Sequence, residues 1–222
     1  MKIAIDGPAG AGKSTVAKAV AEKLGINYLD TGAMYRAAAY AMLQQGIEPG
    51  DIEKVVLALD NLSMEIAYKD RTQHVLINGE DVTQRIRTPQ ISKGASDIAV
   101  IPEVRVKLVE IQRNVAKQYD LVMDGRDIGT YVLPDADYKI FLTASAKERA
   151  LRRYREMTNA GQDADLDEIE RGIIARDQTD STRKFAPLRQ ADDAVLVDTT
   201  SMGKHEVICA ILKLIKGDAE TK

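Results

Sequence analysis

The sequence predicts an α/β fold with a five-stranded parallel sheet flanked by helices, within one domain spanning residues 1–222. Three observations lead to it. Short apolar runs alternate along the chain with longer stretches of helical periodicity, which is the pattern of strand–helix–strand units. The runs are continuously apolar, as strands are when helices cover both faces of a parallel sheet. A glycine-rich loop also follows the first run and leads directly into a stretch of good helix-forming residues.

The predicted elements follow from these runs and from the residues that start or end them. Gly25 stands where a helix ends, Asp51 suits a helix start, and Pro102 suits a first helical turn. The expected strands are residues 3–5, 26–29, 120–124, 138–142 and 194–198. The expected helices are residues 15–24, 33–45, 51–59, 90–99, 102–118, 146–157, 166–178 and 204–216.

Residues 61–83 break this pattern. Apolar and polar residues alternate from Leu62 to Lys69, a period of two that is typical of a half-buried strand. Residues 74–77 form a second run, and Asn78-Gly79 is a favoured hairpin turn before a third. We therefore expect three short antiparallel strands in a small inserted subdomain. An ordinary edge hairpin of the main sheet is the alternative.

Composition limits the partners and the location. The net charge of −3 leaves no basic excess of the kind that binds nucleic acid, and a hydrophobic share of 45% is ordinary for a soluble protein. No stretch approaches the roughly twenty apolar residues that cross a bilayer. We expect a cytoplasmic protein that binds neither nucleic acid nor membrane. A monomer is expected as well, because no long apolar stripe indicates an obligate partner.

The single cysteine, Cys209, cannot form an intrachain disulfide, which fits a reducing compartment. Apolar residues recur around it at helical spacing, so it is predicted to be a small core residue. His74 and His205 have no cysteine or histidine neighbour at ligand spacing, so a structural zinc site is not expected.

The glycine-rich loop after the first strand is the clearest ligand-binding motif. Its residues are Gly7, Pro8, Ala9, Gly10, Ala11, Gly12, Lys13, Ser14 and Thr15. Glycines let successive backbone N–H groups turn inward, and the following helix adds its own unpaired N–H groups and positive dipole end. The motif predicts a bound nucleoside triphosphate, with Lys13 at the β- and γ-phosphates and the Ser14 hydroxyl on Mg²⁺. A plain tight turn is the alternative.

Polar residues also gather where predicted strands end, at the edge of an open α/β sheet where ligands bind. They are Asp30, Thr31, Gly32, Tyr35 and Arg36 after the second strand, Asp124 to Asp127 after the third, and Asp198 to Thr200 after the fifth. Asp124 and Asp127 are the carboxylates nearest the nucleotide, and either suits a water on Mg²⁺ or a contact with the acceptor. The alternative for Asp124 is that it only caps the loop after its strand.

Arginines near these loops are the second signal. They are Arg36, Arg126, Arg149, Arg152, Arg153, Arg176 and Arg183. A phosphoryl-transfer transition state spreads negative charge over several oxygens, and guanidinium groups stabilise that charge from several sides. The alternative for residues 149–153 is a solvated basic face paired with Glu148 and Glu156. Residues 161–166 resemble the tip of a mobile lid that excludes water, or else a plain exposed loop.

Six blocks of the sequence together resemble the bacterial cytidylate kinases, a family of P-loop nucleoside monophosphate (NMP) kinases. The blocks are residues 5–15, 30–36, 102–105, 124–130, 176–183 and 186–188, and the resemblance covers almost the full length. Many enzymes share the loop alone, but DTGAMYR at 30–36 and DGRDIGT at 124–130 together are specific. The family implies a P-loop kinase fold, an NMP-binding region at residues 33–105 that includes the insert, and a lid at about residues 153–176.

The resemblance also implies a role for each matching residue. Residues 7–15 with Arg152 and Arg153 would bind ATP, and Ser14 and Asp124 would hold Mg²⁺. The catalytic residues would be Lys13, Arg126, Asp127 and Arg176. The CMP-binding residues would be Thr31, Tyr35, Arg36, Ser96, Arg105, Arg126, Asp127, Arg176, Asp180 and Arg183. Within that set, Arg36 and Arg126 would bind the phosphate of CMP. The edge of the cytosine base would be bound by Ser96, Arg105 and Asp127.

The expected reaction is in-line transfer of the ATP γ-phosphoryl group to the phosphate of CMP, and of dCMP, without a protein base. A carboxylate at residue 127 suits the N4 amino group of cytosine and repels the O4 atom of uracil. Two alternatives stay open. One is a P-loop kinase for another nucleotide or a small metabolite. The other is a regulatory NTPase, although the sequence has no guanine-reading Asn-Lys-x-Asp stretch.

Overall fold

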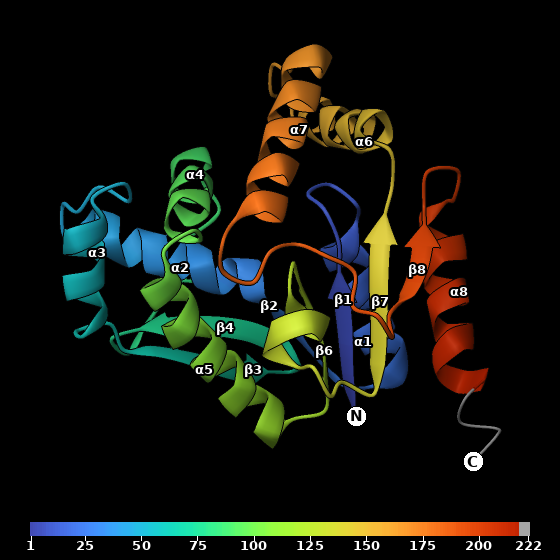
Figure 1. The fold of residues 1–222 in the computed structure, drawn as a ribbon, viewed down its shortest axis with the longest axis horizontal. Helices are drawn as coiled ribbons and strands as arrows, with labels where there is room; N and C mark the ends of the chain where they lie inside the picture. Colours follow the sequence, from blue (N-terminus) through green and yellow to red (C-terminus); the bar gives the residue numbers. More distant parts are fainter. Residues whose placement is uncertain (218–222) are drawn as a thin grey trace. The chain divides into compact units, whose positions relative to one another are not determined.

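The structure is a computed structural model that describes residues 1–217. It divides into two compact units, and most of their helices and strands are labelled in Figure 1. The first unit joins Met1–Gly25 to the chain from Val122 onward, and the second is Ile26–Leu121. Within residues 1–217, no helix combines the length and the apolar character of a membrane span.

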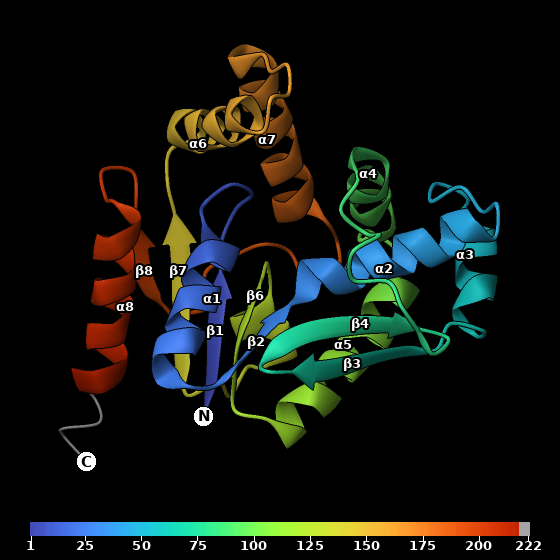
Figure 2. The same cartoon turned by 180° about the vertical axis from the view of Figure 1, so that it is seen from behind.

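The first unit is built on the strands around the glycine-rich loop. Its elements are β1 (Lys2–Asp6), α1 (Lys13–Leu24), β6 (Leu121–Gly125), η1 (Ile128–Val132), β7 (Tyr138–Thr143), α6 (Ala146–Asn159), α7 (Leu166–Thr182), β8 (Val195–Asp198) and α8 (Lys204–Gly217). Figure 2 shows α1 and α8 in front of the strands, and these two helices pack on each other. The α1 helix buries Val16, Ala17 and Val20, which share one helical face. The π-helical turn η1 packs against β1.

The second unit packs helices around a small antiparallel sheet. Its elements are β2 (Asn27–Asp30), α2 (Thr31–Gln44), α3 (Ile52–Leu59), β3 (Met64–Lys69), β4 (Thr72–Ile77), β5 (Glu80–Asp81), α4 (Pro89–Ile98) and α5 (Pro102–Gln118). As predicted, the Asp51 side chain caps α3 by accepting from the Lys54 N–H, and Pro102 begins α5. The α2 helix packs on α4 and β4, and α5 packs on α3 and β3.

The main sheet has five strands in the order β2-β6-β1-β7-β8, which confirms the predicted fold class. β7 pairs in parallel with β1 on one side and β8 on the other, so that Ile140 lies opposite both Ile5 and Val195. The strands within residues 61–83 form a separate antiparallel sheet in the order β3-β4-β5. The three predicted antiparallel strands are therefore confirmed, and the alternative of an edge hairpin of the main sheet is wrong.

Both hairpin turns of the inserted sheet have positive φ at their two central residues, as type I′ turns do. Asn78 and Gly79 adopt 50° and 83°, in the turn that the sequence predicts. Asp70 and Arg71 adopt 50° and 61°, although neither residue is a glycine. The strong twist of these turns matches the twist of the flanking strands. In the pair of β3 and β4, Met64 lies opposite Ile77.

The prediction that helices cover both faces of the strand at residues 194–198 is wrong. Val195 is 45% exposed and Leu196 is 54% exposed, whereas Val197 is buried. The cause is the strand order, because β8 is the last strand of the sheet and has a partner on one side only. An apolar run of four or five residues does not distinguish a central strand from an edge strand.

The prediction that Cys209 is a core residue is also wrong, because its side chain is exposed. The α8 helix buries Val207, Ile211 and Ile215, which recur every four residues along one face. Cys209 lies off that face beside His205, and its Sγ is 3.7 Å from the imidazole nitrogens. His205 therefore has a cysteine neighbour four residues along the helix, and the prediction that it has none at ligand spacing is wrong. The apolar residues around Cys209 occupy more than one face, so their spacing was ambiguous.

Candidate active site

The glycine-rich loop joins β1 to α1, the strand–loop–helix context that its motif requires. Gly7 passes so close to β7 that a Cβ atom there would lie 1.9 Å from the carbonyl oxygen of Leu142. Gly12 adopts a φ of 87° at the N-cap of α1, which glycine reaches without strain. The loop therefore curls directly ahead of a helix N-terminus, where phosphate binding is favoured.

Lys13 is buried beside this loop, where its Nζ donates to the carbonyl oxygen of Pro8 at 2.7 Å. Burial, and then the nearby cations Arg126 and Arg176, hold the pKa of Lys13 well below its ordinary value, although the carboxylate of Asp124 opposes them. A desolvated cation attracts a phosphate more strongly than a cation in water does. Lys13 is thus placed for a phosphate, at a cost to the stability of the fold.

Ser14 and Asp124 lie together, as a shared metal site requires. The Ser14 hydroxyl donates to Asp124 Oδ2 at 2.9 Å, and Asp124 is buried in β6. Mg²⁺ prefers oxygen ligands and keeps several waters, so one hydroxyl, one carboxylate and the phosphates of a nucleotide suit it. Within residues 1–217, no group of three or more His, Cys, Asp or Glu side chains is placed to hold a metal. The donor set fits Mg²⁺.

Asp6, to which the sequence assigned no role, holds the loop after β6. It is the last residue of β1 and accepts from the N–H groups of Ile128 at 2.8 Å and Gly129 at 2.7 Å. These groups begin η1, a π-helical turn that was not predicted. Burial raises the pKa of Asp6 to about 6, despite the two donors. Through η1, Asp6 fixes the backbone beside Asp127.

Four of the predicted CMP-binding side chains form one network in the first unit. Arg126 Nε donates to Asp180 Oδ2 at 2.8 Å. Arg183 donates to Asp127 Oδ1 at 3.0 Å, and another of its nitrogens lies 3.9 Å from Asp180 Oδ1. The side chains of Arg183 and Asp127 are almost fully buried, with 6% and 7% exposed. The two carboxylates fix the direction of both guanidinium groups.

Asp180 provides a pH-dependent test of this network. Burial opposes its ionisation, but the guanidinium groups of Arg126, Arg176 and Arg183 outweigh burial and lower the pKa of the carboxyl below 3.8. A lowered pKa contributes stability that is present above the unfolded-state pKa and is lost as the pH falls through the folded-state pKa. We expect the difference in unfolding free energy between wild type and Asp180→Asn, measured by urea titration, to shrink from about pH 6 to about pH 3. A constant difference over that range contradicts the network.

The arginines predicted to bind ATP have different surroundings. Arg152 on α6 donates to the carbonyl oxygen of Thr199 at 2.6 Å and to its hydroxyl at 3.0 Å. Arg153 is exposed and pairs with Glu156 at 3.3 Å, the solvated arrangement that the sequence left open. Arg152 therefore ties α6 to the loop after β8, and a role of Arg152 and Arg153 in ATP binding stays a prediction. Arg176, which was predicted to be catalytic and to bind CMP, is exposed on α7, and that role stays a prediction as well.

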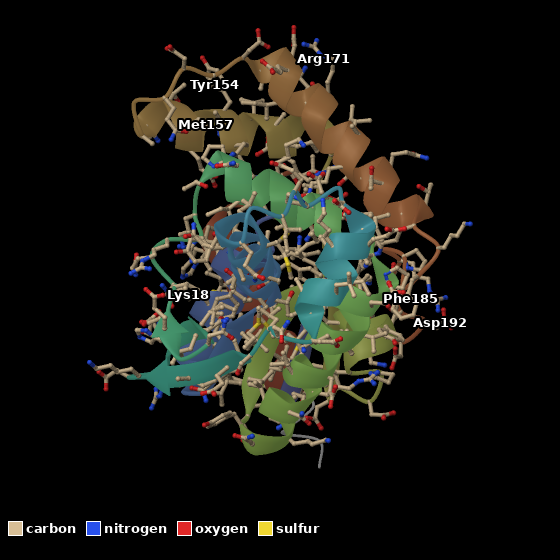
Figure 3. The ribbon with its side chains drawn as sticks, turned by 90° about the vertical axis from the view of Figure 1, so that its left-hand side faces the viewer. Lys18, Tyr154, Met157, Arg171, Phe185 and Asp192 are labelled. Carbon is tan, nitrogen blue, oxygen red and sulfur yellow. The ribbon has the colours of Figure 1, made fainter. Side chains whose placement is uncertain are left out.

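The α6–α7 hairpin contains the predicted lid. Tyr154, Met157 and Arg171 mark its loop end in Figure 3. Gly161 adopts a φ of 71°, and the Gln162 N–H donates to the Met157 carbonyl oxygen at 3.0 Å, which closes the end of α6 in a tight turn. The mobility of this hairpin stays a prediction.

In the second unit, Asp30 organises the residues predicted to hold the acceptor phosphate. Its Oδ1 caps α2 by accepting from the Ala33 N–H, and its Oδ2 accepts from Arg36 at 2.9 Å. Thr31 is buried as the first residue of α2. Arg36 Nε is buried and has no hydrogen-bond partner among the residues that the structure describes. A buried N–H group without a partner costs free energy, so the Nε–H group of Arg36 favours the binding of an anionic ligand.

Tyr35, Ser96 and Arg105 also belong to the second unit. The Arg105 guanidinium lies over the Tyr35 ring, 5.8 Å from its centre, and donates to the carbonyl oxygen of Ala99 at 3.3 Å. The Ser96 hydroxyl donates to the Ser92 carbonyl oxygen at 3.3 Å, one turn earlier in α4. Tyr35 and Ala99 therefore hold the buried Arg105 side chain in one orientation.

The inserted sheet makes a contact that the sequence did not reveal. Gln73 on β4 accepts from the Asp30 N–H at 2.7 Å, and its amide donates to the Asp30 carbonyl oxygen at 3.3 Å. One side chain thus holds both backbone polar groups of a residue that is 43 positions away. The insert therefore braces the residue that orients Arg36.

Comparisons with known proteins confirm the resemblance. A family model described as cytidylate kinase matches residues 3–217. The cytidylate kinase of Caldicellulosiruptor saccharolyticus is 51% identical over 214 residues, covering 96% of this chain and 95% of that protein. The cytidylate kinase of Lactiplantibacillus plantarum is 51% identical over 215 residues, covering 97% and 94%. The solved structure of a gluconokinase from Sinorhizobium meliloti has a TM-score of 0.53 at 14% identity, covering 99% of this chain and 94% of that chain, which shows a shared fold.

Proposed function

Because the chain belongs to the cytidylate kinase family, we propose that it transfers the γ-phosphoryl group of ATP to CMP, and to dCMP as a second acceptor. The observation that carries this proposal is the loop of residues 7–14 with Lys13 buried beside it, in a chain that matches the family along almost its whole length. The products are ADP and the diphosphate CDP or dCDP.

Lys13 and the N–H groups of the loop hold the β- and γ-phosphates of ATP. The attacking phosphate oxygen of CMP is already ionised near neutral pH, so no protein group has to remove a proton. Catalysis then consists of placing the reacting groups in line and neutralising the charge that moves toward the β-phosphate. Arg126 and Arg176 support this assignment, because both lie near enough to lower the pKa of Lys13.

Ser14 and Asp124 are the residues that would hold Mg²⁺. The ion, when bound, neutralises charge on the transferring phosphoryl group. Asp124 supports this role because its burial and its hydrogen bond to Ser14 fix the carboxylate beside the loop.

Asp124→Asn is expected to raise the Mg²⁺ concentration that gives half-maximal activity by about tenfold, because the amide keeps an acceptor for Ser14 but loses the negative charge. A Mg²⁺ titration at saturating ATP and CMP measures it. Asp193→Asn, at a carboxylate that is 66% exposed, is the matched control and should leave the titration unchanged. An unchanged Mg²⁺ dependence in Asp124→Asn contradicts the assignment.

Arg36 and Arg126 bind the CMP phosphate in this proposal, and the Thr31 hydroxyl adds a donor. The unpartnered Nε of Arg36 supports its part, since a phosphate oxygen would satisfy it. The sugar hydroxyls and the remaining phosphate oxygens of CMP bind to Arg176, Asp180 and Arg183.

Ser96, Arg105 and Asp127 select the base. Cytosine presents an N4 amino donor beside its N3 and O2 acceptors, so a carboxylate suits the first and a guanidinium suits the others. Uracil carries an acceptor at O4, which Asp127 repels. Tyr35 contributes by holding Arg105 in place.

The organisation proposed from the sequence accompanies this function. We propose one functional domain, with residues 33–105 as the NMP-binding region and residues 153–176 as a lid that excludes water. A monomer in the cytoplasm, without nucleic acid or membrane as a partner, completes the proposal.

An acceptor panel tests the proposed function. ADP release from ATP is followed in a coupled assay with CMP, dCMP, UMP, AMP or no acceptor. We expect efficient turnover with CMP and dCMP and little with the others. A clear preference for another acceptor would instead support a different P-loop kinase. Undiminished ADP release without any acceptor would support a regulatory NTPase.

A further inference from the structure

The backbone N–H and C=O groups of Ala9, in the glycine-rich loop of residues 7–14 (the phosphate loop), both bond to one ion pair from the α6–α7 hairpin. Asp177 Oδ1, on α7, accepts from the Ala9 N–H at 3.2 Å. Arg149, in the first turn of α6, donates to the Ala9 carbonyl oxygen at 2.8 Å. The two side chains pair with each other, with an Arg149 nitrogen 2.6 Å from Asp177 Oδ2. These contacts therefore join the loop, α6 and α7 to one another.

This ion pair is largely withdrawn from water. The Arg149 side chain is 7% exposed and that of Asp177 is 21% exposed. Arg149 also donates from Nε to the Ala144 carbonyl oxygen at 2.9 Å, and it packs so closely on Gly10 that a Cβ there would lie 3.2 Å from its own Cβ. A buried ion pair seldom stabilises a fold more than apolar residues of similar volume would. Its contacts with the loop indicate a role other than stability.

We propose that Arg149 and Asp177 are positioning residues for phosphoryl transfer. They fix the first half of the phosphate loop through Ala9, and they tie to that loop the helix that carries Arg176. The inference rests on the proposed function of the loop as the ATP site. Neither side chain has to touch the nucleotide, because each acts through the backbone that it holds.

The α7 helix is attached to the core of the first unit at a second point. Asp180, three residues after Asp177, accepts from Arg126 at 2.8 Å. Two attachments one turn apart hold the segment that carries Arg176, whose charge already acts on Lys13. If the attachment at Ala9 is lost, the loop's N–H groups lose their fixed direction and α7 can move Arg176 away from the phosphates. Both the affinity for ATP and kcat should then fall.

Titration calorimetry with ATP and, separately, with CMP tests this role on two variants. Asp177→Asn keeps an oxygen for the Ala9 N–H but loses the charge that pairs with Arg149, and Asp177→Leu loses both. We expect the Kd for ATP to rise about threefold in Asp177→Asn and about thirtyfold in Asp177→Leu. The Kd for CMP should rise by much less than the Kd for ATP, because Asp180 still holds α7 at Arg126 and Arg176 is only one of several groups proposed to bind CMP. The value of kcat should fall in the same order as ATP affinity.

Asp193→Asn is the matched control. It breaks the ion pair between Lys139 and Asp193, which is also 2.6 Å long and lies in the same unit, and it should change neither Kd. A lower unfolding free energy in Asp177→Leu with an unchanged Kd for ATP would assign the pair to fold stability and overturn the proposal. Equal weakening of ATP and CMP would overturn it as well. If Asp177→Leu does not fold, an ATP Kd in Asp177→Asn equal to that of wild type overturns it.

The proposed function and this inference fail in different ways. ATP binding needs no acceptor, so the calorimetric result on Asp177 stands even if CMP is not phosphorylated. A failed acceptor panel refutes the proposed function alone, and an unchanged ATP affinity in the variants refutes the positioning role alone.

Discussion

Lys13→Met is expected to lower kcat about a thousandfold without lowering the free energy of unfolding. Two effects separate in this variant. The charge that faces the transferring phosphoryl group disappears, and so does the cost of holding a desolvated cation beside Arg126 and Arg176. Methionine fills most of the space of the lysine stem, so packing changes little. Steady-state kinetics at saturating ATP and CMP and urea unfolding of the same preparation measure both effects.

Lys18→Met is the matched control for this prediction. Lys18 lies on the same helix, α1, but is exposed, and it is labelled in Figure 3. We expect its activity to stay within about twofold of wild type, since an exposed charge is screened by solvent. Retention of more than about a tenth of wild-type kcat in Lys13→Met would mean that Lys13 does not contact the reacting phosphates.

Asp127→Asn is expected to lower kcat/KM for CMP about a hundredfold and to change kcat/KM for UMP by far less. The amide of asparagine can present either a donor or an acceptor, so the variant no longer favours the N4 amino group over the O4 atom. The same change weakens the buried pair with Arg183 and should cost about 3 kcal/mol of unfolding free energy. Kinetics with both nucleotides and urea unfolding measure the two consequences.

Asp180→Asn is the control for that loss of stability. Asp180 belongs to the same network, with Arg126 at 2.8 Å and Arg183 at 3.9 Å, but is not assigned to the base. Its replacement should lower kcat/KM for CMP and UMP by the same factor. An equal loss on both nucleotides in Asp127→Asn would show that Asp127 acts only through the network.

Much of the fold was predictable because its signals are local. The loop from Gly7 to Ser14 is one continuous stretch, and its strand and helix flank it directly. The three-stranded insert follows from a period of two and an Asn-Gly turn. The neighbourhood of Ser14 and Asp124 followed from a general rule, since the carboxyl ends of parallel strands share one edge of a sheet.

The remaining parts of the site depend on contacts between residues that are far apart in the chain. Asp6 meets Ile128 across 122 positions, and Arg149 meets Ala9 across 140. No periodicity or spacing reports such a pair, because it depends on strand order and on the direction of individual side chains. Strand order cannot be read from the sequence, which also explains the wrong prediction that helices cover both faces of β8. A helix with apolar residues on more than one face explains the wrong prediction for Cys209.

The central claim is that Asp127 recognises the N4 amino group of cytosine, and deleting that group from the substrate tests it most directly. The substrate is the 5′-monophosphate of the pyrimidin-2-one riboside, which carries hydrogen where CMP carries the amino group. We expect wild type to use it with a kcat/KM about a hundredfold below that for CMP, and Asp127→Asn to treat the two nucleotides alike within about threefold. The same hundredfold preference for CMP in both enzymes would contradict the claim.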